Sequence, residues 1–232
     1  MVDVSRNYKV HLDSFQSGEP NSENYTSCYS DGSKLKNDQT GYGLVITRGD
    51  TMIASKNGSL SPLNSVFQSE IFAIDSASQI LKNLDTKSAT IFSDSQAGLS
   101  ALAGVHIKSK VVKNCVENLN ELGKSCKIEL KYVRGHADHT GNEIADFFAK
   151  EGAIDLANKV NLPSPKSNAL RKISHALYNS WNQRWISSSE NFRQTRIWFP
   201  VINKKKSDFL SNLVLDRQTL GDMIDWYSYR SL

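Results

Sequence analysis

Three consecutive stretches near the start of the chain are rich in β-branched and aromatic residues and are separated by turn residues. They span residues 25–33, 41–48 and 51–58, and the dipeptide Gly49–Asp50 joins the second to the third. Short stretches of this composition, linked by tight turns, are typical of neighbouring antiparallel strands. The pattern therefore predicts a three-stranded antiparallel meander.

After the meander the period of the apolar residues changes. Residues 65–84 place Phe67, Ile71, Ile74 and Leu81 at helical spacing. Two further strands are predicted at 88–94 and 126–133, and further helices at 95–104, 109–125 and 140–153. This order predicts an α/β fold with a mixed five-stranded sheet, an antiparallel meander plus parallel strands, flanked by helices.

The two ends of the chain differ from this central pattern. Residues 1–24 are polar and lack a period, so we expect a flexible N-terminal lead-in before a domain at 25–156. The segment LPSP at 162–165 predicts a linker, and residues 157–232 are predicted to be that linker followed by a helical C-terminal extension. One amphipathic helix is expected there, and its apolar positions are Leu170, Ile173, Leu177 and Trp181.

Charge is distributed unevenly along the chain. The net charge is +4, yet residues 162–232 hold 11 Lys and Arg against 5 Asp and Glu, together with all four tryptophans. A basic segment with aromatic residues is compatible with nucleic-acid contact. A helix with a solvated basic face explains the same composition, and both interpretations stay open.

Several classes of protein are disfavoured by composition. There is no run of eighteen apolar residues to span a membrane, and the first residues hold no secretory signal. The three cysteines, Cys28, Cys115 and Cys126, form no CxxC pair and indicate reduced thiols. We therefore expect a cytoplasmic or nuclear protein without a membrane partner.

Four carboxylates occupy special places in the predicted layout. Asp31 and Asp94 end strands, Glu70 lies in the first turns of a helix, and Asp146 lies on the final helix. Each alone has an ordinary structural explanation, such as a turn, a helix terminus beside the cap residue Ser95, or a solvated face. Together they can converge, because ligands of such sheets gather at the carboxyl ends of strands.

Segment 25–152 resembles the ribonuclease H family. The likeness rests on the motifs SDGS, SEIFAI, FSDSQ and RGHADHTGNEIADFFAK, which follow the family's order. The chain is most similar to ribonuclease H domains of non-LTR retrotransposon polyproteins, on the weaker basis of WNQRW at 181–185 and WFP at 198–200. This second likeness adds a reverse transcriptase, in the same polyprotein or in trans, as a candidate partner.

The resemblance implies a set of catalytic residues and a cofactor. Its metal-binding acids fall on Asp31, Glu70, Asp94 and Asp146, and its mobile catalytic histidine falls on His136. Two Mg²⁺ ions, for which Mn²⁺ can substitute, would stabilise the phosphate charge, activate water and stabilise the leaving oxygen. In the family's division Asp31 is shared, Glu70 and Asp94 hold the metal on the leaving-group side, and Asp146 holds the metal on the water side.

The resemblance also implies contacts with an RNA–DNA hybrid. Substrate-binding residues are expected at Gly32, Ser33, Ser65, Ser95 and Gln96. The residues just before Glu70 read VFQS and lack the asparagine common in cellular members. The chain also lacks the extra basic protrusion that some members use to grip a hybrid, so the basic C-terminal extension becomes the candidate substitute.

The segment Arg134–Asp146 has a competing interpretation as a zinc site. His136, His139, Glu143 and Asp146 could supply four ligands, but structural zinc usually includes cysteine and catalytic zinc usually has more histidines. Glu143 instead suits a capping box with Thr140 as the N-cap residue. A structural role is favoured for His139, and the segment is predicted to be one wall of a catalytic centre.

The predicted function is that of a metal-dependent endonuclease that hydrolyses the RNA strand of RNA–DNA hybrids, derived from or part of a retrotransposon. One alternative is a catalytically inactive nucleic-acid-binding domain of the same fold. Another is a different nuclease on this scaffold, such as an integrase or exonuclease. The intact set of four acids favours the active enzyme.

Overall fold

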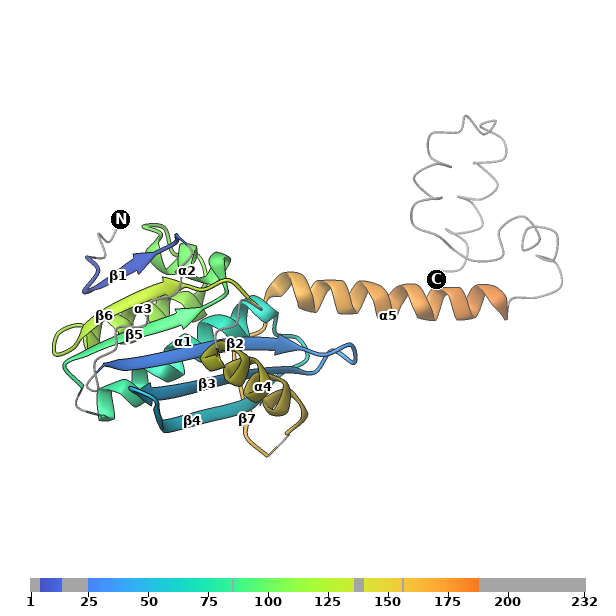
Figure 1. Cartoon of the computed structure of the whole chain (residues 1–232). Helices are drawn as coiled ribbons and strands as arrows, with labels where there is room; N and C mark the ends of the chain where they lie inside the picture. The colour runs from blue at the N-terminus through green and yellow to red at the C-terminus, as the bar shows by residue number, and fades with distance from the viewer. Residues whose placement is uncertain (1–4, 14–24, 85, 136–139, 156, 188–232) are drawn as a thin grey trace. The chain divides into compact units, whose positions relative to one another are not determined.

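The computed structural model describes residues 5–13, 25–84, 86–135, 140–155 and 157–187. It contains a seven-stranded mixed sheet in the order β1-β6-β5-β2-β3-β4-β7 (Figure 1). The strands are β1 (Tyr8–His11), β2 (Thr26–Lys34), β3 (Thr40–Arg48), β4 (Thr51–Leu60), β5 (Ser88–Ser93), β6 (Lys127–Tyr132) and β7 (Lys159–Val160). The helices are α1 (Val66–Asn83), α2 (Gln96–Ala103), α3 (Lys110–Leu122), α4 (Thr140–Ile154) and α5 (Lys166–Ile186).

The predicted mixed α/β architecture is confirmed. Strands β2, β3 and β4 pair as the expected antiparallel meander. Strand β5 then pairs parallel with β2, and β6 pairs parallel with β5. The central strand β2 therefore joins the antiparallel half of the sheet to its parallel half.

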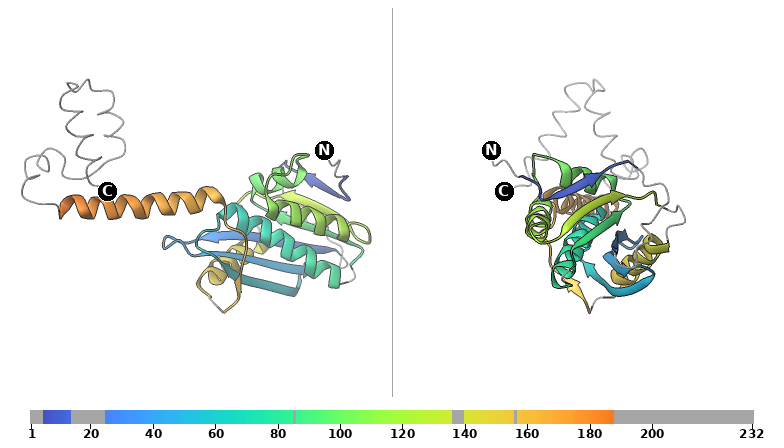
Figure 2. Two further views of the ribbon diagram at one scale, coloured as in Figure 1. Left: turned by 180° about the vertical axis from the view of Figure 1, so that it is seen from behind. Right: turned by 60° about the vertical axis from the view of Figure 1, so that its left-hand side comes forward.

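Alternating side chains of the strands fill cores on opposite faces of the sheet. Cys28, Leu44 and Ile91 belong to the larger core, which α1 and α3 cover. Their neighbours in sequence, Tyr29 and Val45, point the other way into a smaller core against α4. Figure 2 shows these helices on the two sides of the sheet.

Helix α4 lies unusually close to the sheet because two glycines of β3 make room for it. A Cβ atom on Gly41 would lie 2.2 Å from the backbone nitrogen of Ala153, and one on Gly43 would lie 2.3 Å from that of Ala149. Any larger residue at either position would displace the helix. This close packing fixes the helix that carries Asp146 against the centre of the sheet.

The prediction of five strands and of a loose lead-in over all of residues 1–24 was wrong. Strand β1 pairs parallel with β6, with Tyr8 opposite Ile128. Tyr8 is buried, and its hydroxyl donates to the carbonyl of Leu102 at 2.8 Å. Four residues are too few to establish an alternating period, so only the tertiary pairing reveals this strand.

The seventh strand lies in the segment that the sequence predicts to be a linker. Strand β7 pairs parallel with the end of β4 and extends the sheet by one strand. The first compact unit of the fold reaches Ala169, so the predicted boundary at 156 falls too early. The second unit begins at Leu170.

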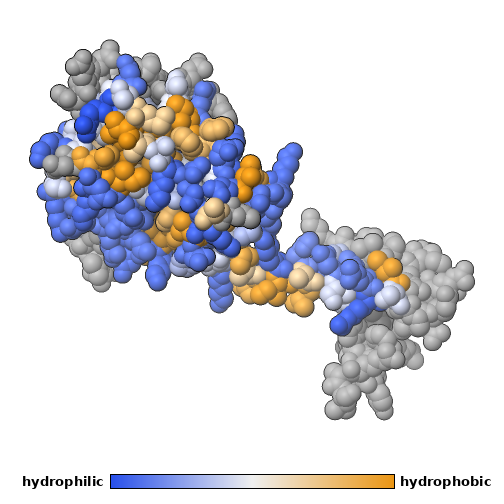
Figure 3. All heavy atoms as spheres, turned by 90° about the horizontal axis from the view of Figure 1, so that it is seen from below, coloured by the Kyte–Doolittle hydropathy of each residue, from blue (hydrophilic) through white to orange (hydrophobic). Residues whose placement is uncertain are grey.

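Helix α5 matches the predicted amphipathic helix. Leu170, Ile173, Leu177 and Trp181 are all at least half exposed, and none of the residues of α5 is buried. Apolar side chains of this helix are visible as orange spheres in Figure 3. No helix among the described residues has the length and apolar character needed to cross a membrane.

Two smaller predictions can be compared with the structure directly. Cys28, Cys115 and Cys126 are free, as expected; all three are also buried, and burial raises the pKa of each thiol. The described part of α4 starts at Thr140, directly after residues that lie outside the described ones, so the predicted N-cap role of Thr140 stays a prediction. Glu143 is correctly placed in the first turn.

Candidate metal centre

Three of the four predicted acids come together at one end of the sheet. Asp31, Glu70 and Asp94 each offer a carboxylate oxygen, and these oxygens all lie within 4.8 Å of one another. Asp31 and Glu70 are buried, whereas Asp94 is partly exposed. The three oxygens are thus close enough to bind one metal ion together, and the side chain of Asp94 is accessible to solvent.

The register of two parallel strands places two of the acids side by side. Ser30 of β2 is paired with Ser93 of β5, and this is the last pair between the two strands. Asp31 and Asp94 are the next residues along each chain. Asp94 follows the end of β5, as predicted, whereas Asp31 lies within β2, which continues to Lys34 because it stays paired with β3, so the prediction that Asp31 ends its strand was wrong. Both acids lie where the parallel pairing of β2 with β5 ends.

Glu70 lies on α1, which packs on the sheet, and it reaches the two aspartates only because this helix lies very close to β2. A Cβ atom on Gly32 would lie only 2.5 Å from both the backbone nitrogen of Glu70 and Oγ of Ser69. The first turns of α1 therefore pack directly on the backbone of β2. Glycine at position 32 is what allows the carboxylates of Asp31 and Glu70 to meet.

Burial and mutual repulsion dominate the electrostatics of the group. Burial, with the charge of Asp94 second, raises the pKa of Asp31 from its ordinary 3.8 to about 7. Burial and the charges of Asp31 and Asp94 raise the pKa of Glu70 well above its ordinary value. The backbone N–H of Gly32 opposes both shifts. The group thus resists full ionisation until a cation compensates it.

One atom of the group fits a cation particularly well. Oε2 of Glu70 is buried and has no hydrogen-bond partner among the described residues. Buried polar atoms normally have a hydrogen-bond partner, so a buried carboxylate oxygen without one, in a cluster of acids, indicates a position where a cation can bind. The donors are all carboxylate oxygens, which suit hard cations such as Mg²⁺ and Mn²⁺.

Asp146 lies at the edge of this group. Its side chain is within hydrogen-bonding reach of Asp31 and raises the pKa of that carboxyl. Its Oδ2 atom also forms an ion pair of 2.6 Å with Nζ of Lys150, one turn further along α4. Asp146 is therefore near enough to join the centre, although its carboxylate also forms an ion pair with a lysine.

The predicted histidine lies outside the described residues, as does His139. Gly135, the last described residue before His136, lies next to the acids, because a Cβ atom on Gly135 would lie 3.0 Å from Oδ2 of Asp94. The zinc interpretation, which needs both histidines, is likewise not tested by the described residues.

The predicted substrate-binding residues are distributed around the acids. Gly32 is buried against α1, Ser33 and Ser95 are partly exposed, and Gln96 is exposed at the start of α2. Two of the serines already serve as helix caps. Oγ of Ser95 accepts from the N–H of Gly98 at 3.2 Å, and Oγ of Ser65 accepts from that of Gln68 at 3.2 Å.

Two residues of the surroundings were not predicted. Lys150 follows Asp146 by four residues, a spacing that identifies an ion pair on a helix and could have been found in the sequence. Gln68 forms the capping box of α1 with Ser65. Gln68 also contacts Pro163, which lies 95 residues further along the chain, and no pattern in the sequence near either residue predicts this contact.

A comparison with models of protein families agrees with the resemblance seen in the motifs. A family model described as RNase H matches residues 23–154, which include all four acids. A search of curated proteins finds no match. The N-terminal RNase H domain of a Mycobacterium tuberculosis protein, solved as a fusion with maltose-binding protein, is 16% identical, with a TM-score of 0.48 over 56% of this chain and 94% of that one.

A second solved structure, RNase H1 from the halophilic archaeon Halobacterium salinarum, is 21% identical. Its TM-score is 0.47, and the match covers 56% of this chain and 98% of that one. The family assignment depends on the family model, which spans more than half of the chain.

Proposed function

This chain belongs to the RNase H family, and from that premise we propose that it is a metal-dependent endonuclease that cuts the RNA strand of RNA–DNA hybrids. The observation that carries the proposal is the meeting of Asp31, Glu70 and Asp94 within 4.8 Å. The unpartnered Oε2 of Glu70 supports it, since a carboxylate with a purely structural role would normally have a hydrogen-bond partner for each buried oxygen.

The proposed cofactor is a pair of Mg²⁺ ions, with Mn²⁺ able to substitute. Asp31, Glu70, Asp94 and Asp146 would hold them, with Asp31 shared by both. When bound, the ions supply charge stabilisation at the phosphate and an activated water. Asp146 would have to exchange its contact with Lys150 for this role.

The protein's own residues would orient the substrate and handle protons. Gly32 and Ser33 lie on β2 directly after Asp31, so their main chain is well placed to read the 2′-hydroxyl that distinguishes RNA from DNA. Ser65, Ser95 and Gln96 are the further proposed contacts to the backbone of the hybrid. His136 is proposed to move a proton near neutral pH, as its ordinary pKa suits this task.

The context of the enzyme is a separate proposal. The WNQRW and WFP segments support an origin in a retrotransposon, with a reverse transcriptase as partner, and the lack of CxxC pairs supports a cytoplasmic or nuclear location. The basic residues of α5 are proposed to contribute phosphate contacts of the kind that give salt-sensitive affinity.

The test is an assay of a labelled RNA–DNA hybrid against duplex RNA, duplex DNA and single strands, with Mg²⁺, Mn²⁺ or a chelator. We expect only the RNA strand of the hybrid to be cut, and only with metal. Asp94→Asn should lower the rate more than about a hundredfold, because it weakens metal binding and charge stabilisation. Asp50→Asn, in an exposed turn, is the control and should cleave at the normal rate.

The outcomes separate the competing functions. Hybrid binding without cleavage by the unaltered chain would identify an inactive binding domain. Cutting of duplex DNA would identify a different nuclease on the same scaffold. Full-rate cleavage by Asp94→Asn would refute the proposed centre.

A further inference from the structure

The segment 159–168, which we call the strap, runs from β7 to the first turn of α5. The strap packs on the sheet and on α1, although its sequence suggests a linker. Val160 and Leu162 are partly buried, and they pack against a small core that contains Tyr42, Leu60 and Ala73. The strap is therefore part of the first folded unit.

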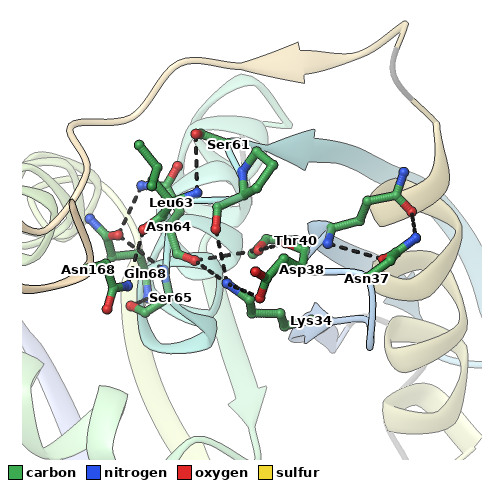
Figure 4. Close-up of polar contacts among 12 residues, drawn as sticks. Lys34, Asn37, Asp38, Thr40, Ser61, Leu63, Asn64, Ser65, Gln68 and Asn168 are labelled. Carbon is green, nitrogen blue, oxygen red and sulfur yellow. Dashed lines mark hydrogen bonds and ion pairs between the residues drawn. The ribbon is translucent and has the colours of Figure 1, made fainter. Parts of the chain in front are cut away.

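Polar contacts attach the strap to the loop that precedes α1 (Figure 4). The carbonyl of Pro163 accepts a hydrogen bond of 2.8 Å from Nε2 of Gln68 and a longer one of 3.4 Å from Nδ2 of Asn64. Nδ2 of Asn168 donates to the carbonyl of Leu63 at 3.1 Å. The strap is thus attached both to the loop and to the first turn of the helix.

Gln68 is the residue that joins the strap to the helix start. Its Oε1 accepts from Nδ2 of Asn64 at 2.9 Å and from the backbone N–H of Ser65 at 3.3 Å. Its Nε2 donates to Pro163. Gln68 is only 6% exposed, so both the oxygen and the nitrogen of its amide form hydrogen bonds away from water. Hydrogen bonds are electrostatically stronger in such surroundings.

The same loop is held from the opposite side by the strand that carries Asp31. Nζ of Lys34, near the end of β2, donates to the carbonyls of Pro62 and Asn64, each at 3.1 Å. The loop before α1 therefore lies between β2 and the strap, with hydrogen bonds to both (Figure 4).

The start of α1 is also where the metal centre depends on close packing. Glu70 lies two residues after Gln68, and the backbone at Glu70 approaches Gly32 too closely to admit a Cβ atom. A small shift of this helix start would change the separation of the Glu70 and Asp31 carboxylates. Catalytic and metal-binding groups are sensitive to displacements of this size.

We infer that the strap is a positioning element of the metal centre, and that Gln68 is the positioning residue through which it acts on Glu70. The inference rests on the proposed function in that the acids bind divalent metal. It adds that residues beyond 156 are needed for the metal affinity of the domain.

The test uses the full chain and measures Mn²⁺ binding directly, by electron paramagnetic resonance of free Mn²⁺. Gln68→Met keeps the length of the side chain but removes its hydrogen bonds to Ser65, Asn64 and Pro163. We expect the Mn²⁺ dissociation constant to rise about fivefold, the factor that corresponds to one lost net hydrogen bond. Asn168→Ala should raise it by a smaller factor.

Matched variants separate positioning from general stability. Gln79→Met removes a hydrogen bond to Asp75 elsewhere on α1, and Asn179→Ala removes the same side chain as Asn168→Ala from the exposed surface of α5. Both controls should bind Mn²⁺ as the unaltered chain does. All variants are compared well below their unfolding temperatures, which are measured separately.

Each outcome decides the inference. Weaker Mn²⁺ binding by Gln68→Met supports it even if no hybrid is cut, in which case only the proposed activity fails. Unchanged Mn²⁺ affinity with a lowered unfolding temperature overturns it and leaves the strap a purely stabilising element. An unaltered chain that binds no Mn²⁺ overturns both the inference and the proposed centre.

Discussion

The carboxylates of Asp31 and Glu70 approach within 4.8 Å of each other although both residues are buried. Burial raises the pKa of both groups, and each lies next to another acid. Such an arrangement costs stability in the absence of metal, because buried like charges repel and are poorly solvated. The proposed function explains this loss of stability, since acids that must bind a metal ion have to lie close together even where their repulsion destabilises the metal-free protein.

Asp31→Asn should therefore stabilise the metal-free protein, by about 1–3 kcal/mol near neutral pH. The folded state holds the Asp31 proton up to about pH 7, whereas the unfolded chain loses it near 3.8. The free energy of unfolding of the unaltered chain should fall as pH rises through this window. Urea unfolding at several pH values in chelator checks this, and a variant less stable than the parent at pH 7 would contradict it.

Metal affinity should depend on pH in the opposite direction. Mg²⁺ must displace protons from Asp31 and Glu70, whose pKa values are raised. Affinity should therefore rise steeply with pH, up to about tenfold per pH unit for each proton released. Calorimetric titration in buffers of different ionisation enthalpy measures the protons released. Binding of equal strength at pH 5.5 and pH 8 would exclude these carboxylates as the ligands.

Lys150→Gln should increase the affinity for the metal ions. The ammonium group contacts Asp146 at 2.6 Å and so competes with any cation that approaches this carboxylate. Its removal should lower the half-saturating Mg²⁺ concentration of cleavage about two- to fivefold at low salt. Lys113→Gln is the matched control, because Lys113 forms an i,i+4 pair with Glu117 on the exposed face of α3. A higher metal requirement in Lys150→Gln would assign the lysine a supporting role instead.

Loss of charge on α5 should weaken hybrid binding without altering catalysis at saturation. Arg171 and Arg184 are exposed, and α5 contains no acidic residue. Replacing both by Gln should reduce the slope of log affinity against log salt by about 1–2. The control pair, Lys124→Gln with Lys127→Gln, lies at the start of β6, whereas the acids lie near the other end of the neighbouring strand β5. Equal salt slopes for the unaltered chain and the α5 variant would leave α5 without a role in binding.

The outline of the fold could be predicted because its main elements carry long local patterns. Helix α1 spans 18 residues, and strands β2, β3 and β4 span 9 or 10 each, which is enough to establish a period. Strand β1 has four residues and β7 has two, so neither could be recognised without its partner. The strap was predicted to be a linker because proline-rich turns look alike whether or not they pack on a domain.

The four acids could be predicted as candidates from the sequence alone, because each stands in a motif that keeps its neighbours and its order along the chain. The distances between Asp31, Glu70 and Asp94 in space depend on the tertiary structure. They are set by the register of β2 with β5 and by the contact of Gly32 with α1. The attachment of Gln68 to Pro163, 95 residues away in sequence, also appeared only in three dimensions. Local sequence determines which groups a segment offers, whereas distances between segments depend on packing contacts made across the whole chain.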